Sequence, residues 1–350
     1  MSDIALSSEA TEGRLRRLLR QLLPYIVAVL AAFAAAGIFI AIMGFNVLEA
    51  YRTILTTSFK STNGFVQTLL KFVPLILMAL AFTIPFRAGK FNIGGEGQFI
   101  VGATGAVAVG ILLADLPLIL LLPLVVIAGT LFGALWAAIA AWLLYRFGIH
   151  EILSTVLLNF VSFQVLDYVA TEIWRDPVAG HPTTIPIGAG GYLPKLIASP
   201  PLHSGLIIAV LVAIAAYIFV ERTPAGYELV ATGANPRAAS VYGINTRLLF
   251  VLSLVLGGAM AGLAGGIEVA GVHHRLIEGM QSNFLVLGII IGLISRGSLA
   301  ALPFVAFFIA VLEVGASAMQ RTLGIPVEMV FIVEALILIF ILLTDVFRRR

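Results

Sequence analysis

The sequence contains no cysteine among its 350 residues. Disulfides, thiolate nucleophiles and cysteine-ligated metal sites are therefore excluded. Charged residues are also scarce, at 11% of the chain against 60% hydrophobic residues, and the mean hydropathy is +1.08. A soluble domain has about 25% charged residues. The composition therefore predicts a polytopic membrane protein.

Motifs that mark enzymes and nucleotide-binding proteins are missing as well. The phosphate-binding pattern G-x-x-x-x-G-K-[ST] does not occur, because Gly89-Lys90 lacks the earlier glycine and the following Ser or Thr. Neither H-E-x-x-H nor G-x-S-x-G is present, which removes support for an intramembrane protease or esterase. The adjacent His273 and His274 point apart on a helix, so they predict no metal site. We expect no catalytic residue, metal or cofactor in this chain.

The net charge is only +3, and the basic residues concentrate at the ends of apolar stretches. The sequence pI of about 9.3 therefore reflects orientation in a lipid bilayer and predicts no nucleic-acid partner.

Ten apolar stretches have about the length that a membrane span needs, which is roughly 20 residues. They are 22–43, 64–85, 92–114, 116–145, 150–171, 204–220, 247–271, 283–295, 298–318 and 326–346. The stretch 283–295 is short, and it could join its neighbour as a re-entrant hairpin through Arg296-Gly297-Ser298. We predict an all-α protein with about ten transmembrane helices and a single transmembrane domain over 1–350.

The distribution of basic residues predicts the orientation of these spans. Four arginines between 14 and 20 precede the first span, which predicts a cytoplasmic tail at 1–21. A signal peptide cleaved near Ala34–Ala36 is the alternative, but the apolar run is long for one and many spans follow. Alternation then places both termini in the cytoplasm. It makes 172–203 the largest outer loop and 221–246 the largest cytoplasmic loop.

A weak internal likeness links Glu96-Gly97-Gln98-Phe99 to Gln281-Ser282-Asn283-Phe284. Each stands at the start of a span rich in small residues, and the two spans run in opposite directions in the predicted topology. The likeness suits an inverted repeat, although it is too short to establish one.

The cytoplasmic loop contains the signals of a short, self-capped helix. Asn235 is a good N-cap, Pro236 fits the first helical position, and Gly243 can end the helix in the left-handed conformation. A helix this short needs a surface to lie against. That surface is either the membrane or a groove on a cytoplasmic partner, which small residues would enter closely. The candidate docking residues are Asn235, Pro236, Arg237, Ala238, Ala239, Tyr242 and Gly243.

The segment 89–98 combines polar side chains with four glycines between two apolar stretches. A membrane accepts a broken helix only where it lines a cavity or is buried in protein. Asn92, Glu96 and Gln98 could present donors and acceptors to a polar solute. Alternatively, the segment is a tight turn with Glu96 in water beside Arg87 and Lys90, or Glu96 accepts backbone N–H bonds.

Three more polar side chains lie within apolar stretches. Asn159 and Glu151 are eight residues apart and share a helix face, which fits either a solute pathway or hydrogen bonding between helices. Glu268 follows a run of glycines that permits close helix approach. An intramembrane carboxylate is a site candidate by default, although Glu268 could instead pair with His273 or Arg275.

Four segments in combination resemble a known family. The loop at 226–244 reads G-x-E-L-x-A-x-G-x-N-P-x-A-A-x-x-x-G-I and resembles the cytoplasmic coupling segment of ABC-importer permeases. That class serves ribose-type sugars, branched-chain amino acids and nucleosides. The segments Asn92–Gln98, His150–Phe160 and Ala261–Glu268 resemble its nucleoside or simple-sugar subgroup, although His150 stands where an amide residue would be expected. The resemblance covers about residues 60–345.

The resemblance implies the permease subunit of an ATP-driven importer in the bacterial cytoplasmic membrane, carrying a nucleoside or a simple sugar. A cytoplasmic ATPase subunit would bind the ATP and dock on 234–245. A second homologous permease subunit would complete the pore, and a periplasmic or lipid-anchored solute-binding protein would deliver solute. The competing hypothesis is an ion-coupled secondary transporter, which also fits an inverted repeat and midplane carboxylates. Such a carrier has no need of a docking helix.

Overall fold

The computed structural model describes residues 23–24 and 26–348, so the predicted tail at 1–21 lies outside the described residues. The described chain forms two compact units. The larger unit is Ser58–Val311, and the smaller one combines the residues up to Thr57 with those from Leu312. The polar segments discussed above all belong to the larger unit.

The helices that lie within the larger unit are α3 (Thr62–Arg87), α4 (Gly95–Leu112), α5 (Leu118–Phe147), α6 (Glu151–Tyr168), α7 (Gly205–Arg222), α8 (Pro224–Ala234), α9 (Pro236–Val241), α10 (Thr246–Glu268) and α11 (Phe284–Ile294). Two helices, α2 (Val47–Lys60) and α12 (Leu302–Leu323), contain the residues where the units join. The smaller unit also holds an apolar helix at Ile26–Ile42 and α13 (Glu328–Arg348).

All ten predicted stretches contain a helix, which confirms the all-α prediction. Within the described ranges, seven helices are long and apolar enough to cross a membrane, and two shorter apolar helices accompany them. One of the short helices is α11, whose 11 residues reach only about 16 Å. It cannot cross a bilayer alone, as the length of 283–295 predicted. The amphipathic helix α2 lies between two predicted spans and was not expected.

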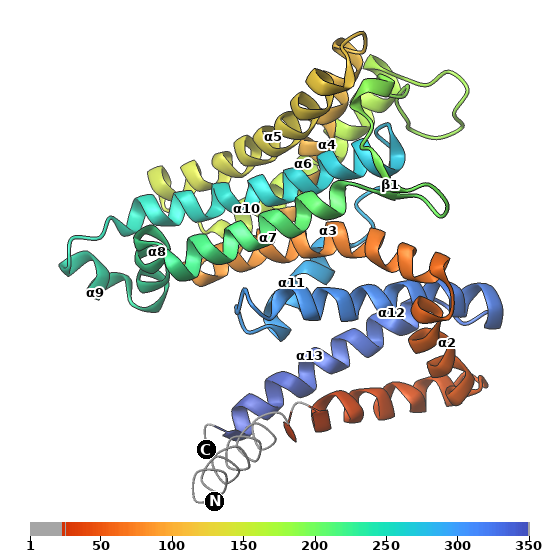
Figure 1. Cartoon of the computed structure of the whole chain (residues 1–350). Helices are drawn as coiled ribbons and strands as arrows, with labels where there is room; N and C mark the ends of the chain where they lie inside the picture. The colour runs from red at the N-terminus through yellow and green to blue at the C-terminus, as the bar shows by residue number, and fades with distance from the viewer. Residues whose placement is uncertain (1–22, 25, 349–350) are drawn as a thin grey trace, which may run out of the picture. The chain divides into compact units, whose positions relative to one another are not determined.

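The predicted inner and outer loops lie at opposite ends of the larger unit, with α8 and α9 at one end and β1 (Lys195–Ile197) at the other (Figure 1). At the α8 end, the Arg87 guanidinium lies 3.0 Å from the Glu221 carboxylate and donates to the Gly297 carbonyl at 3.1 Å. Arg87, which closes α3, therefore lies at the same end as α8. We call this the α8 end and the opposite one the β1 end.

Three helices meet in the core through glycines rather than side chains. A Cβ atom on Gly102 of α4 would overlap the backbone of Gly262 in α10 and the carbonyl of Gly129 in α5. Gly133 and Gly258 approach each other in the same way. Small residues permit this approach in membranes, where packing, not water exclusion, holds helices together. Gly258 and Gly262 of α10 thus form a packing surface.

The predicted outer loop is folded onto the helix ends. It holds a π-helical turn η1 (Val169–Ile173), a 3₁₀ turn η2 (Ala189–Gly191), and strand β1 paired antiparallel with β2 (Leu202–His203). The Gly188 N–H donates to the Gly110 carbonyl at 2.9 Å, and the Ile187 N–H donates to the His274 carbonyl at 2.9 Å. These bonds fix the loop over the ends of α4 and of η3 (Val269–His273), the π-helical turn that follows α10.

Candidate functional site

The segment between α3 and α4 is an irregular break, as its glycines predicted. Helix α3 ends at Arg87, Gly89 adopts a left-handed φ of +75°, and α4 begins only at Gly95. Five of the seven residues from Asn92 to Gln98 are buried. The break is therefore enclosed by protein, one of the two settings in which a membrane tolerates it.

Two side-chain amides form a reciprocal pair inside this break. The Asn92 Nδ2 donates to the Gln98 Oε1 at 2.8 Å, and the Gln98 Nε2 donates back to the Asn92 Oδ1 at 2.8 Å. Asn92 also accepts from the Gly94 N–H at 3.1 Å and donates to the Ala81 carbonyl at 3.1 Å. Both side chains are 1% exposed. Their amides hold the chain in shape.

Asn159 holds the break from α6. Its Nδ2 donates to the Ile93 carbonyl at 2.8 Å, and its Oδ1 accepts from the Gly97 N–H at 2.8 Å. A backbone carbonyl before α4 and an N–H in its first turn, neither of which has a helical partner, are thereby satisfied. One side chain thus fixes both sides of the helix start.

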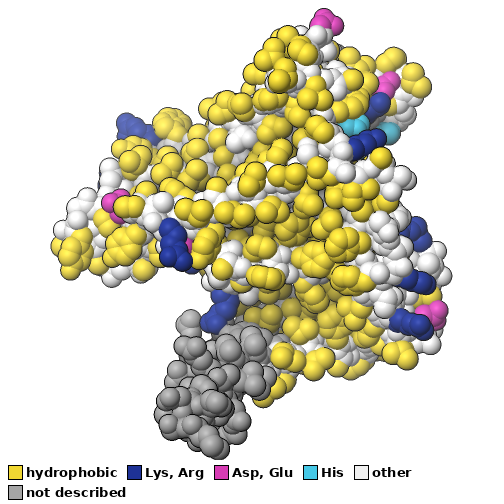
Figure 2. Space-filling view, viewed as in Figure 1, with side chains coloured by type: hydrophobic (Ala, Val, Ile, Leu, Met, Phe, Trp, Pro, Cys, Tyr) yellow, Lys and Arg dark blue, Asp and Glu magenta, His cyan; other side chains and the backbone are white. Residues whose placement is uncertain are grey.

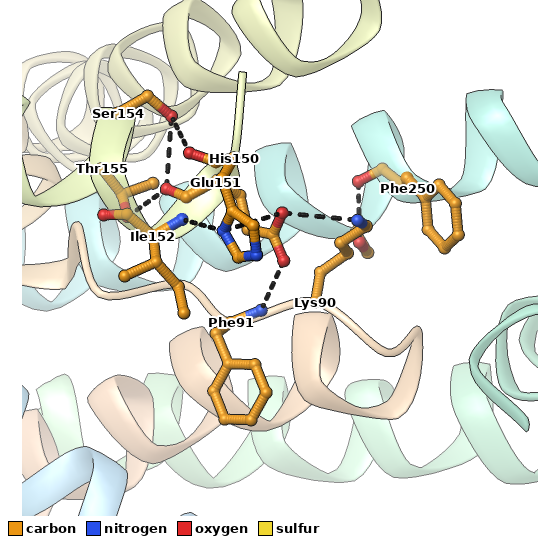
Figure 3. A network of polar contacts seen from close by, with 9 residues as sticks. Lys90, Phe91, His150, Glu151, Ile152, Ser154, Thr155 and Phe250 are labelled. Atoms are coloured by element: carbon orange, nitrogen blue, oxygen red, sulfur yellow. Dashed lines mark hydrogen bonds and ion pairs between the residues drawn. The ribbon is translucent and has the colours of Figure 1, made fainter. Parts of the chain in front are cut away.

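Glu151 binds the start of the same segment, at Lys90 and Phe91. Its carboxylate lies 3.3 Å from the Lys90 ammonium and accepts from the Phe91 N–H at 3.5 Å (Figure 3). The Glu151 side chain is only 4% exposed and that of Lys90 18%. The Lys90 ammonium also stands 4.5 Å from the ring centre of Phe250 in α10. The face shared by Glu151 and Asn159 therefore contacts the break.

Glu96 differs from its neighbours because, among the described residues, its carboxylate has no hydrogen bond or ion pair. It sits in the first turn of α4 and is partly exposed. The expected neighbours Arg87 and Lys90 bind Glu221 and Glu151 instead. Glu96 therefore forms no ion pair with either cation. Negative charge is favourable at a helix N-terminus, which suits Glu96 without a cation.

Glu268 lies at the last turn of α10 and is 5% exposed. Its carboxylate lies 3.6 Å from the Nε2 of His273, one of its two expected partners. Lys71 of α3 also interacts with it electrostatically, and the Lys71 ammonium stands 4.8 Å from the ring centre of Phe284. Arg275, the other expected partner, binds Asp176 at 2.7 Å.

The self-capped helix is present as α9. The Asn235 Oδ1 accepts from the Ala238 N–H at 3.1 Å, Pro236 is the first helical residue, and Gly243 has a φ of +85°. Ala238 and Ala239 do not share one outward face, contrary to the expectation, because Ala239 is 5% exposed and faces its own chain. The outward side chains include Val241 and Tyr242, which are 84% and 86% exposed.

A second helix in this loop, α8, was missed. Thr223 caps it by accepting from the Gly226 N–H at 3.1 Å, and Pro224 is its first residue. Thr223-Pro224 is the same signal as Asn235-Pro236, so the sequence could have revealed it. A Cβ atom on Gly233 would overlap the carbonyl oxygen of Arg87. Helix α8 therefore connects α9 to the start of the break.

Membrane-length helices, a buried polar break between two of them and a capped pair of helices at one end together define a membrane transport protein. No group of three or more potential metal ligands occurs in the part of the chain that the structure describes. Residues 64–342 match the family described as branched-chain amino acid transport system / permease component. The chain belongs to this family and is a multi-pass permease of the ABC transporter class.

Curated relatives match over nearly the whole chain. A glucose ABC transporter permease protein, TsgB13 of Haloferax volcanii, is 31% identical over 93% of this chain and 88% of its own. The guanosine permease protein NupP of Bacillus subtilis is 30% identical over 93% and 94%. The nucleoside permease protein NupB of Lactococcus lactis is 30% identical over 92% and 91%. No solved structure matches the chain.

Proposed function

We propose that this permease carries a nucleoside, with a simple sugar as the second candidate, into the cell across the bacterial cytoplasmic membrane. The observation that carries the proposal is the similarity over more than nine tenths of the chain to permeases named for guanosine, nucleosides and glucose. Both termini lie in the cytoplasm in this proposal, so the α8 end faces inward and the β1 end outward.

The proposed pathway includes Asn92, Glu96, Gln98, Asn159 and Glu268. Within this set Glu96 contacts the solute, because its carboxylate is unpaired in the described chain. It can accept hydrogen bonds from the hydroxyl groups of a ribose or another sugar. Asn92, Gln98 and Asn159 shape the wall that presents Glu96. Glu268 acts at the opposite end of the helix block, where Lys71 compensates its charge and His273 lies 3.6 Å from its carboxylate.

The ATPase subunit docks on α9 in this proposal. Val241, Tyr242 and Ala238 are exposed and form the contact, while Asn235, Pro236, Arg237 and Gly243 set the helix geometry and Ala239 seats it on its own chain. The contact between Gly233 and Arg87 passes movement from α8 to the break. The permease itself performs no catalysis and binds no cofactor, because the ATP belongs to its partner.

A second, homologous permease completes the pore as a heterodimer. In Bacillus subtilis, two proteins are named guanosine permeases, and this chain is 30% identical to NupP over 93% of its length but 28% identical to NupQ over 61%. Haloferax volcanii shows the same contrast between TsgB13 and TsgC13. We propose that this chain takes the NupP-like position, and that a solute-binding protein delivers solute at the β1 end.

The test is uptake by proteoliposomes that contain this permease with its second permease, ATPase and binding protein. Radiolabelled guanosine, adenosine and glucose are supplied outside, and ATP inside. We expect ATP-dependent uptake of a nucleoside, or of glucose for the second candidate. Uptake by this chain alone, driven by a proton or sodium gradient, would instead establish a secondary transporter.

A further inference from the structure

A pocket of about 290 Å³ opens at the β1 end of the larger unit. Its lining residues are Leu70, Tyr192, Leu193, Lys195, Pro201, His203, Gly271, Val272 and His274. Figure 2 shows histidine and basic side chains gathered on this part of the surface, which is otherwise largely hydrophobic. The pocket lies away from the break between α3 and α4, so its chemistry belongs to neither the break nor the coupling helices.

His203 is built into one wall of this pocket. It is 4% exposed. A Cβ atom on Gly271 would stand 2.8 Å from two of its ring carbons, and one on Gly205 would stand 2.6 Å from its Nδ1. The two glycines therefore leave the space that the imidazole fills. This close packing holds the ring in one orientation.

The hydrogen bonding of His203 decides what it can recognise. Its Nδ1 accepts from the Gly205 N–H at 3.2 Å, so in the neutral ring the Nε2 carries the proton. That Nε2 is buried and finds no acceptor within residues 23–24 and 26–348. A protonated Nε2 cannot ligate a metal, so the wall presents a donor that needs an acceptor. Burial and the neighbouring His274 lower the pKa of His203 to about 4, which keeps the ring neutral.

The rest of the lining supplies one positive charge and a flat apolar platform. Lys195 is exposed on β1, and the lining residues include no carboxylate in this described region. The ring of Tyr192 stacks on that of His274 with centres 3.8 Å apart. His274 holds a left-handed φ of +57°, an uncommon backbone conformation that His adopts more readily than most non-glycine residues.

We propose that this pocket binds a singly charged carboxylate with a small apolar body. One carboxylate oxygen accepts from the His203 Nε2–H, and the other pairs with the Lys195 ammonium. The apolar body lies against Tyr192 and Leu193. A single ammonium and a neutral imidazole balance one negative charge, which favours a carboxylate over a doubly charged phosphate. The carboxylate belongs either to a free small molecule or to an acidic side chain of a protein that docks at this end.

Benzoate is the probe, with benzamide as its neutral isostere. The full chain, purified in detergent, is heated at increasing concentrations of each compound at pH 7 and constant ionic strength. A ligand that binds the folded state raises the unfolding temperature in a saturable way. We expect benzoate to do so and benzamide to have little effect. Equal effects of both compounds, or no effect of benzoate, would overturn the proposal.

Two variants connect any binding to the pocket. Lys195→Gln removes the charge from an exposed position, and we expect its benzoate affinity to fall at least about tenfold. In Gly271→Ala the new methyl group pushes on the His203 ring. This variant should weaken the binding of benzoate more than it weakens the binding of benzamide. The matched controls are Lys60→Gln and His181→Gln, which change exposed side chains outside the lining. Unchanged benzoate affinity in Lys195→Gln would sink the assignment.

Competition identifies the source of the carboxylate. If saturating benzoate weakens binding of the solute-binding protein to the wild-type permease but not to Lys195→Gln, the natural occupant is an acidic side chain of that partner. If the partner binds equally well with benzoate present, the occupant is a free carboxylate. Solute uptake by the reconstituted complex is scored separately, so failure of this site and failure of the proposed transport function remain distinguishable.

Discussion

Gly233 and Arg87 touch through their backbones, because any Cβ atom at residue 233 would overlap the Arg87 carbonyl oxygen. A backbone oxygen cannot turn aside as a flexible side chain can. Gly233→Ala should therefore push α8 away from the end of α3 at a cost of about 1–3 kcal/mol. We expect a lower unfolding temperature and reduced solute-stimulated ATP hydrolysis in the assembled complex. Gly180→Ala is the control, since nothing lies within 4 Å of that position, and an unaffected Gly233→Ala would remove α8 from the coupling route.

The outward face of α9 can be tested without disturbing its seat. Ala238→Arg adds a charge at an exposed position and should abolish solute-stimulated ATP hydrolysis while the permease still unfolds at the wild-type temperature. Ala239→Arg should also lower the unfolding temperature, because Ala239 is buried against its own chain. Normal coupled transport by Ala238→Arg would show that the ATPase docks elsewhere.

The Lys90–Glu151 pair should matter more for stability than the Arg87–Glu221 pair. Removal of one partner from a fully buried ion pair costs about 3–5 kcal/mol, and an exposed pair contributes about 0–1 kcal/mol. Glu151 is 4% exposed, whereas Glu221 is 33% exposed. We expect Glu151→Ala to lower the unfolding temperature well below that of Glu221→Ala. Lys90→Met combined with Glu151→Leu should recover much of the loss, and a double variant as unstable as Glu151→Ala would contradict the pairing.

Glu96 and Gln98 should separate solute contact from structural support. Glu96→Gln changes a carboxylate without a partner in the described chain, so we expect an unchanged unfolding temperature and uptake weakened several-fold at limiting solute. Gln98→Ala removes two hydrogen bonds from the buried Asn92 amide, which keeps only those with the Ala81 carbonyl and the Gly94 N–H, and the loss should cost about 1–3 kcal/mol. It should lower both stability and uptake. Wild-type uptake by both variants would make this segment a purely structural turn.

Acid should destabilise the protein through His203. Its pKa is lowered from 6.5 to about 4 by burial and by His274, so the unfolded chain takes up a proton first as the pH falls. The folded state therefore loses about 3 kcal/mol between pH 6.5 and pH 4 and nothing further below that range. The unfolding temperature of His203→Phe should fall less steeply over this range than that of the wild type. The exposed His181→Gln should retain the wild-type slope, and equal slopes for His203→Phe and wild type would refute this origin.

The sequence predicted helices far better than contacts. Apolar runs have to become helices in a membrane, so all ten stretches were found, and the capping signals of Asn235-Pro236 located α9. The partners of Lys90 and Asn92 could not be read in the same way. Glu151 is 61 residues from Lys90, and only the packing of α6 beside the break brings them together. The sequence also could not show which of the two adjacent alanines, Ala238 or Ala239, is exposed, because their side chains are identical.

The glycine contacts among α4, α5 and α10 bring the three backbones together at several points and leave few side chains there that could repack when the protein changes state. Helices that touch backbone to backbone over several turns behave as one rigid body. Glu96 stands at the start of α4 and Glu268 at the end of α10, so the spacing between these carboxylates is set by that body. We expect the distance between the two carboxylates to stay constant through the transport cycle, while the surfaces that they face move relative to them.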